Sequence, residues 1–415
     1  MKIRSLLLGS VAAAGLSTGA FATDLGVETS LDVCDELGLS GLTISSDTNC
    51  LQITGEVSYE FNWGDYIDTG GPGDPNGLTL MSTFSPTNGT FNVINNNGAN
   101  DWSSSVDYWL QFVATASSSF GPATAHLKLS GSNGGIGVNE AWVGVGDTTM
   151  LMAGMKGSIF KSGDDEPLNF LGLFVSSSVD AGVAADFGQV NTGGHVIQVV
   201  SDLGNGLWIG GGLEDLNNNG TAVGVLSYSD DTISAHISFA TDEILSGNVG
   251  DWIGHAGLTG TWDMVKFVGA VAFNDDGNYD ALGSVSFDMS GFKLAASGEM
   301  TDVGEWGVGG SIGTEISDGV SLNLGARYYN NAFPGAYVSQ VAAQIVAAVT
   351  DEVTLTGEVG AIANGPNAIN GPTSLFYGKG EVAWAPGGGF TSSVSGEVNS
   401  LGGYKATFKA AKTIE

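Results

Sequence analysis

The chain has 415 residues, of which only 13% are charged, yet its net charge is −32. So acidic a balance argues against a nucleic-acid partner, because binding to phosphates requires lysine and arginine. Hydrophobic residues make up 42% of the chain, which is too many for an acidic disordered protein. No segment reaches the roughly 18 consecutive apolar residues that predict a membrane-spanning helix.

The first 22 residues have the organisation of a secretory signal peptide. Lys2 and Arg4 precede a short apolar stretch from Leu6 to Leu16, and Ala20-Phe21-Ala22 fits an A-x-A cleavage site. We therefore expect residues 1–22 to be a signal peptide that is excluded from the fold. Without them, the basic residues number 12 − 2 = 10 against 44 acidic residues, and Arg327 is the one remaining arginine.

Residues 51–63 alternate between two kinds of side chain. Every odd position is apolar or glycine and every even position is polar. A period of two predicts a strand with one apolar and one wet face. The run is long for a soluble strand, whereas about 9–11 tilted residues cross a bilayer. Its apolar face ends in Tyr59, Phe61 and Trp63, where a membrane barrel carries an aromatic girdle.

The same alternation recurs many times, for example in residues 123–130, 232–239, 353–359 and 404–410. Tight connectors such as 146–148 and long ones such as 64–104 follow one another along the chain.

Short turns on one rim and long loops on the other are typical of bacterial outer-membrane barrels. We therefore expect an all-β fold in which residues 51–415 form one transmembrane antiparallel β-barrel. A secreted β-sandwich, β-helix or adhesin stays open, because alternation is a weaker signal than a membrane helix.

Cys34 and Cys50 are the two cysteines of the chain. A single pair in an exported protein suggests one disulfide that closes a short loop. The four histidines are scattered along the sequence, so no metal site and no cofactor are expected.

Two stretches resemble the trimeric general porins of alphaproteobacteria. The first joins Leu31 to Gly38 with Asp47 to Gly55, and resembles the start of those porins, where a cysteine pair closes the segment before the first barrel strand. The second joins Glu140 to Gly146 with Ala153 to Phe160, and resembles the strand pair that leads into their third loop.

The resemblance implies a periplasmic N-terminal segment over residues 23–50, closed by Cys34 and Cys50. It also implies a barrel of sixteen strands with a third loop folded into the pore, assembled as a homotrimer in the outer membrane of a Gram-negative bacterium. Two features depart from the family. The chain ends on Ile414 and Glu415 rather than on an aromatic residue, and its alternating runs number nearer twenty, so eighteen or more strands stay open.

Residues 161–166 read Lys-Ser-Gly-Asp-Asp-Glu. Carried over from the family, they are the constriction loop, with Asp164, Asp165 and Glu166 facing the pore. Clusters of carboxylates select cations because they replace the lost hydration of the ion. The alternative is a solvated turn with three exposed acids, which is what charge runs commonly form.

Strand parity also places charged side chains in the lumen. Lys128, Lys293 and Arg327 fall on polar faces and are predicted to oppose the acids at the constriction. A lipid-facing lysine or arginine at the bilayer midplane would cost roughly 2–4 kcal/mol, which favours the lumen. By the same parity, Glu56 and Glu60 are predicted to line the lumen.

Together these features predict an outer-membrane porin for passive diffusion of ions and small hydrophilic solutes, with a preference for cations. A substrate-selective sugar or amino-acid channel, with Trp102, Trp109 and Trp142 as a stacking track, is the first alternative. A non-channel surface barrel or adhesin is the second. No H-E-x-x-H motif is present and no enzymatic activity is expected. Weak divalent cation binding by acidic loops such as Asp275-Asp276-Gly277 is left open.

Overall fold

The computed structural model describes residues 33–34, 37–66, 94, 98–162, 166–174, 190–330, 337–365 and 374–414. The predicted signal peptide lies outside these residues. Within them, no helix combines the length and the apolar character needed to span a membrane.

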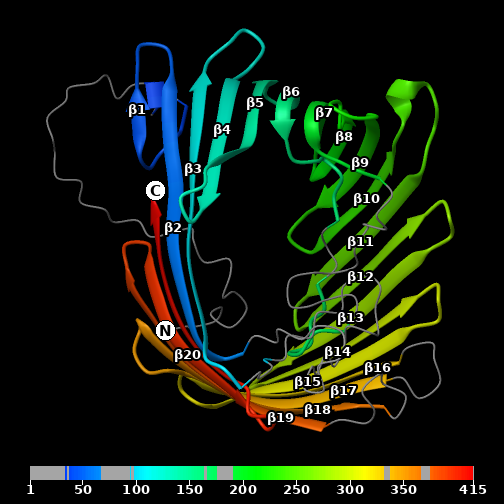
Figure 1. The fold of residues 1–415 in the computed structure, drawn as a ribbon. Helices are drawn as coiled ribbons and strands as arrows, with labels where there is room; N and C mark the ends of the chain where they lie inside the picture. Colours follow the sequence, from blue (N-terminus) through cyan, green and yellow to red (C-terminus); the bar gives the residue numbers. More distant parts are fainter. Residues whose placement is uncertain are drawn as a thin grey trace, which may run out of the picture.

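The described residues form twenty-one strands and one short 3₁₀ helix (Figure 1). The first eleven strands are β1 (Thr43–Ser45), β2 (Cys50–Asp65), β3 (Asp101–Ala116), β4 (Ala123–Ser132), β5 (Gly137–Gly146), β6 (Thr149–Lys156), β7 (Gly194–Gly204), β8 (Leu207–Glu214), β9 (Thr221–Ser229), β10 (Ile233–Thr241) and β11 (Trp252–Trp262). The remaining ten are β12 (Val265–Asn274), β13 (Tyr279–Met289), β14 (Phe292–Thr301), β15 (Trp306–Ser317), β16 (Val320–Asn330), β17 (Tyr337–Ala348), β18 (Val353–Asn364), β19 (Ser374–Gly387), β20 (Phe390–Asn399) and β21 (Tyr404–Ile414). The helix η1 covers Ile244–Ser246.

The sheet closes on itself. Strands β2 to β21 each pair antiparallel with their chain neighbours, and β2 also pairs with β21, from Gly55 opposite Ile414 to Asp65 opposite Tyr404. Within the described residues the result is a closed barrel of twenty strands with β1 outside the ring. The expectation of sixteen strands is therefore wrong, and the larger number that the alternating runs indicated is correct. Closure satisfies the backbone groups of both edge strands, which a barrel in lipid requires.

The disulfide between Cys34 and Cys50 is confirmed. It joins residues 16 positions apart and attaches the N-terminal segment to the first residue of β2. In the same segment, Thr43–Ser45 pair with Cys50–Gln52, on the edge of β2 that β21 occupies farther along. The short strand β1 thus covers the part of the β2 edge that β21 leaves open.

The connectors differ between the two rims. On one rim, tight turns such as residues 147–148, 263–264 and 388–389 join the strands. The other rim carries the long connectors, including residues 66–100 and 157–193. Residues 157–193, the third connector on this long-loop rim, are called the inner loop below. This asymmetry is the one predicted for a bacterial membrane barrel.

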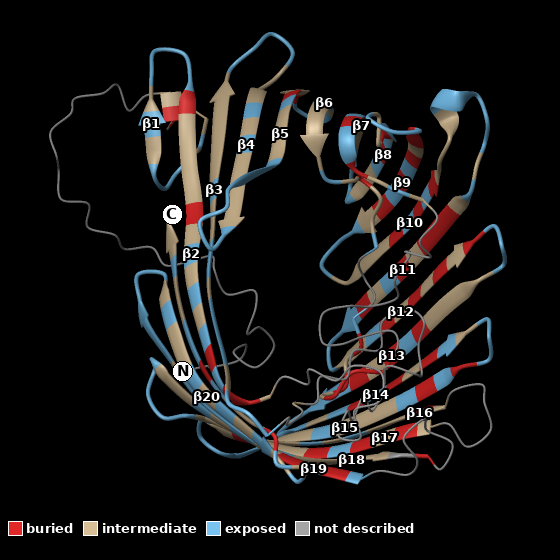
Figure 2. Cartoon of the chain, in the orientation of Figure 1, coloured by how far each residue is buried: buried red, intermediate tan, exposed pale blue. Residues whose placement is uncertain are grey.

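The outward face is apolar and exposed. Leu226, Ile237 and Val341 in the middle of their strands are 43%, 53% and 54% exposed, whereas neighbours on the inward face are buried (Figure 2). Aromatic side chains lie near both ends of this face. Contacting rings near the long-loop rim are Trp63 with Tyr404, Phe239 with Trp252, and Trp306 with Tyr328, and near the short-turn rim Trp384 with Phe390. An apolar band between two aromatic girdles is what a bilayer selects on the outside of a barrel.

The two faces of β20 allow a direct test of this orientation. Val394 is 57% exposed on the outward face, and its neighbour Ser395 points inward, opposite Glu381. Val394→Arg should lower the free energy of unfolding in phosphatidylcholine vesicles by about 2–4 kcal/mol, because the charge would lie in hydrocarbon. Ser395→Arg should change it by less than about 1 kcal/mol, because its charge would lie in water. Guanidinium titration of both variants measures the difference, and equal losses would contradict the assignment of the faces.

Candidate functional site

The described parts of the inner loop lie inside the barrel, against the inward faces of the strands from β8 to β16 (Figure 1). This position agrees with the inward third loop that the sequence resemblance implies. The loop is held by a series of side chains that project from the wall. Most of them accept hydrogen bonds from loop N–H groups, and Gln198 and Arg327 donate to loop carbonyl oxygens, so that backbone polar groups are satisfied away from any strand.

Glu214, at the end of β8, holds both ends of the loop. One carboxyl oxygen accepts hydrogen bonds from Ile159 N at 2.9 Å and from Gln198 Nε2 at 2.8 Å. The other accepts from Gly193 N at 2.6 Å. The side chain is fully buried, and burial of a carboxyl group is tolerated when both of its oxygens are hydrogen-bonded. Glu214 therefore fixes the points at which the loop leaves and rejoins the wall.

Serine hydroxyl groups support the middle of the loop. Ser238 Oγ on β10 accepts a hydrogen bond from Lys161 N at 2.9 Å. Ser284 Oγ on β13 accepts from Leu168 N at 2.9 Å, and Ser311 Oγ on β15 from Phe170 N at 3.0 Å. The loop thus crosses the inner wall of the barrel from strand to strand.

Arg327, on β16, holds residues 173–174, where the described stretch 166–174 of the loop stops. This point is called the far end of the loop below. Its Nη1 donates to Leu173 O at 2.8 Å, and its guanidinium group lies 4.0 Å from the ring centroid of Phe174. The Nε group donates to Gln340 Oε1 at 2.7 Å, which fixes the plane of the guanidinium. Glu299 Oε1 accepts a hydrogen bond from Phe174 N at 3.1 Å. The loop end is therefore held by two charged side chains of opposite sign.

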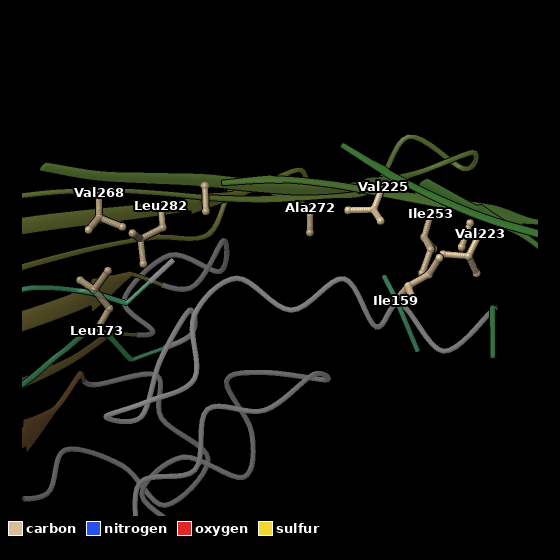
Figure 3. Close-up of a cluster of buried hydrophobic side chains, with 10 residues drawn as sticks. Ile159, Leu173, Val223, Val225, Ile253, Val268, Ala272 and Leu282 are labelled. Atoms are coloured by element: carbon tan, nitrogen blue, oxygen red, sulfur yellow. The ribbon is translucent and has the colours of Figure 1, made fainter. Parts of the chain in front are cut away.

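Apolar packing adds to these hydrogen bonds. Ile159 and Leu173 of the loop pack with inward-facing side chains of β9, β11, β12 and β13, as Figure 3 shows. The wall residues of this cluster include Val223, Val225, Ile253, Val268 and Leu282. At these positions the strands are therefore apolar on both faces, one toward the surroundings and one toward the loop.

Two glycines allow the loop to approach the wall closely. A Cβ atom on Gly309 would lie 2.7 Å from Asn169 Nδ2, and one on Gly325 would lie 2.9 Å from the ring of Phe170. Both distances are shorter than van der Waals contact permits. Glycine is used in strands where another part of the chain comes this close.

Of the six predicted constriction residues, four lie within the described residues and two do not. Asp164 and Asp165 lie outside the described residues. Glu166 is exposed. Its charge acts on the ammonium group of Lys293, and so do the charges of Asp288 and Lys266. Arg327 points inward as predicted, but its guanidinium group binds the loop rather than standing free in the lumen. Lys128 lies on a different wall, with its Nζ 4.9 Å from the ring centroid of Trp109.

The two predicted lumen glutamates lie on the polar face of β2. Glu60 forms an ion pair with Lys409 at 2.9 Å, its direct partner on β21. Glu56 lies opposite Trp109 on β3. Farther round the same wall, Lys379 and Glu397 form a second cross-strand ion pair at 3.7 Å.

The acidic character continues at the long-loop rim. Glu305, in the turn between β14 and β15, is 7% exposed. Burial raises the pKa of its carboxyl group, and the neighbouring charges of Asp302 and Glu299 act in the same direction. The far end of the loop therefore lies beside a group of carboxylates.

Sequence reasoning did not identify Glu214 or the serines that support the loop. Each is a polar residue at an inward position, which strand parity alone would have found. Nothing local distinguishes them from other inward residues, because the loop residues they bind lie between 21 and 141 positions away in the chain.

Ser311 also belongs to the sequence Gly309-Gly310-Ser311-Ile312-Gly313, which fits the G-x-S-x-G pattern of hydrolases. In those enzymes the serine occupies a sharp turn between a strand and a helix. Here the five residues lie within β15, and the hydroxyl group accepts a hydrogen bond from the loop. The expectation that the chain is not an enzyme stays a prediction.

No family model matches the chain, and no curated protein matches it. Among solved structures, it is similar to OccK8 (OprE) of Pseudomonas aeruginosa, with 8% identity over 87% of this chain and 98% of that one and a TM-score of 0.48. It is also similar to a mutant of the Rh. blastica porin, with 13% identity over 88% and 99% of the two chains and a TM-score of 0.42. For the outer membrane channel DcaP of Acinetobacter baumannii the identity is 14%, the coverage 90% and 100%, and the TM-score 0.36. Each TM-score is below 0.5, so function is inferred below from the geometry of this chain.

The hydrogen bonds of Glu214 predict how firmly the loop is held. Glu214→Ala removes the acceptor for Ile159 N, Gly193 N and Gln198 Nε2. Leaving buried donors unpaired should lower the free energy of loop opening by about 3 kcal/mol. Cleavage by trypsin after Lys161 should then be roughly a hundredfold faster, because proteolysis follows the population of the open form.

The control for this experiment is Glu381→Ala, which removes an exposed carboxylate from the inward face of β19. It should leave the rate of cleavage unchanged. Similar acceleration in both variants would show that Glu214 does not hold the loop.

Proposed function

We propose that the protein is an outer-membrane channel through which ions and small hydrophilic solutes diffuse passively, with a preference for cations. One observation carries the proposal: a closed, twenty-stranded barrel has an apolar outside and holds one of its own loops against one side of its inner wall. Barrels with 16–18 strands already leave an aqueous channel.

The dimensions support an open lumen. Twenty strands spaced about 4.8 Å apart give a wall roughly 100 Å around and at least about 30 Å across, before strand tilt widens it further. The inner loop packs closely on the β8 to β16 side through Glu214, the serines and Arg327. Its described residues lie along the wall rather than across the barrel, and within the described part of the chain they leave the opposite half of the lumen free.

The charge of the chain supports cation preference. Acidic residues outnumber basic ones by 44 to 12, and a passage lined by one sign of charge concentrates ions of the opposite sign. Among the described constriction candidates, Glu166 is exposed and belongs to the inner loop itself. Asp164 and Asp165 precede it directly in the sequence. We infer that these three carboxylates form the acidic filter.

The proposal includes an assembly of three copies, which is based on the sequence resemblance. The alternative of a surface barrel without a channel makes a different prediction in a bilayer, since such a protein would pass no current. Discrete conductance steps from folded protein would therefore separate the two functions.

Neutralising the proposed filter should reduce cation preference. In planar bilayers under a potassium chloride gradient, the wild-type protein should show a zero-current potential of cation-selective sign. Replacing Asp164, Asp165 and Glu166 by their amides should move this potential toward zero, because charged walls concentrate counter-ions roughly tenfold or more.

A control removes three charges from turns on the short-turn rim: Asp231→Asn, Asp263→Asn and Asp318→Asn, all at exposed positions. This variant has the same net charge as the filter variant and should keep most of the wild-type potential. An unchanged potential in the filter variant would refute the acidic filter while leaving the channel in place.

The contacts of Arg327 with the loop lead to a prediction about the single-channel conductance. Arg327→Gln removes the hydrogen bond to Leu173 O and the contact with the Phe174 ring, so the far end of the loop should move away from the wall. Single-channel conductance should change and current fluctuations should increase. Lys379→Gln, which removes the same charge from a wall position paired with Glu397, should retain the wild-type current trace. Identical behaviour of the two variants would contradict a role of Arg327 in fixing the loop.

A further inference from the structure

A polar recess lies in the inner wall beside the two ends of the inner loop. Its volume is about 490 Å³, within the range of small-molecule sites. It is lined by β4, β5, β6, the loop ends and the first residue of β7. The side chains that concern its chemistry are Lys128, Lys156, Asn139, Glu140, Ser158 and Thr192.

The recess faces the lumen. Residues directly opposite each other in neighbouring strands share a face of the sheet. Glu214, which binds the loop, lies two positions along β8 from Gly212, and Gly212 lies opposite Gln198 on β7. The same face includes Gly154 on β6 and Trp142 on β5, which lie opposite each other. It also includes Glu140, two positions from Trp142 on β5, and Lys128, which lies opposite Glu140 on β4. A solute in the lumen can therefore reach the lysines.

The two lysines are held in place without being neutralised. Lys128 Nζ lies 4.9 Å from the ring centroid of Trp109, and Lys156 Nζ lies 5.4 Å from that of Trp142. Among the residues that the structure describes, neither ammonium group forms an ion pair. An aromatic ring orients an ammonium group but carries no net charge, so the full positive charge remains.

The carboxylate in the recess is engaged elsewhere. Glu140 Oε2 accepts a hydrogen bond from Trp142 Nε1 at 3.1 Å and lies 3.4 Å from His126 Nδ1. The His126 ring stacks on the Trp142 ring, with centroids 5.0 Å apart. His126 thus packs against the indole that orients Lys156, and the Glu140 carboxylate is directed toward His126 and Trp142.

Two lysines elsewhere in the lumen are paired with carboxylates. Lys409 is paired with Glu60 and Lys379 with Glu397, so each of their charges is balanced by its cross-strand neighbour. In so acidic a chain, two unpaired ammonium groups in one recess form a local exception to the overall charge. Neutral hydrogen-bonding groups surround them: the Asn139 amide and the hydroxyl groups of Ser158 and Thr192.

We propose that this recess binds a hydroxylated anion of monosaccharide size, through its carboxylate or phosphate at Lys128 and Lys156 and its hydroxyl groups at Asn139, Ser158 and Thr192. The proposal adds a solute class to the proposed channel, and the solute reaches the site through the lumen. Binding here would retain such an anion at the long-loop end of a passage whose average charge repels it.

The first experiment is titration calorimetry on the purified, detergent-solubilised protein with four probes: gluconate, glucose 6-phosphate, glucose and acetate. Gluconate or glucose 6-phosphate should bind, and the stronger of the two identifies the anionic group. Glucose has the hydroxyl groups without the charge and acetate the charge without the hydroxyl groups, so both should bind at least about tenfold more weakly. Equal binding of acetate, or no binding of either hydroxylated anion, would overturn the proposal.

Matched variants locate the site. Lys128→Gln with Lys156→Gln should raise the dissociation constant for the bound anion by about tenfold or more, because each lysine supplies a charge-assisted contact. Lys379→Gln with Lys409→Gln removes the same two charges from the paired lysines and should leave it within about twofold. Asn139→Asp adds a carboxylate to the recess and should weaken binding in a protein that retains both lysines. Equal effects of the two double variants would overturn the assignment.

Bilayer currents separate this proposal from the proposed channel. The bound anion should reduce the potassium current saturably in the wild type. Binding by calorimetry to a folded protein that passes no current would refute the channel and keep the site. A conducting protein that binds none of the anions would refute the site and keep the channel.

Discussion

The pairing of β2 with β21 is the constraint on which the rest of the structure depends. A sheet in hydrocarbon has no water for its edge groups, so it must close, and closure fixes which side chains face inward. Later features follow from that division: Val394 and its outward neighbours form the apolar outer face, and the inward positions are free to carry polar and charged groups. The disulfide at Cys50 and the short strand β1 lie at this junction and continue the pairing where β21 ends.

Closure also creates a large interior, and the inner loop occupies one side of it. A loop in such a position needs partners for its backbone, and these come from inward side chains that are themselves fixed by the strands: Glu214, Ser284, Ser311 and Arg327. Apolar contacts of Ile159 and Leu173 add the hydrophobic contribution. The wall therefore acts toward the loop as a protein core does, whereas elsewhere it faces water.

That double role explains what the sequence could and could not predict. The alternation over residues 51–63 identifies β2, its faces and the inward position of Glu60 without any other information. The number of strands was harder to predict, because strands under the loop, such as β9 with inward Val223 and Val225, are apolar on both faces and lose the period of two. The contacts of the loop were inaccessible for another reason: Leu173 and Arg327 are 154 positions apart, and only the closed barrel brings them together.

The same geometry allows one lumen to hold sites of opposite charge. Strands β4 and β16, which carry Lys128 and Arg327, are eight and twelve strands apart the two ways round a ring of twenty, so the recess and the wall with Arg327 lie on nearly opposite sides. With a barrel at least about 30 Å across and a Debye length of about 10 Å in 0.1 M salt, the field of one wall is largely screened at the other. The carboxylates near the loop can therefore set the proposed preference for cations while two unpaired lysines form the proposed site for an anion. What distinguishes those lysines is their partner: a carboxylate would cancel the charge of each ammonium group, whereas Trp109 and Trp142 hold it in place and leave it available.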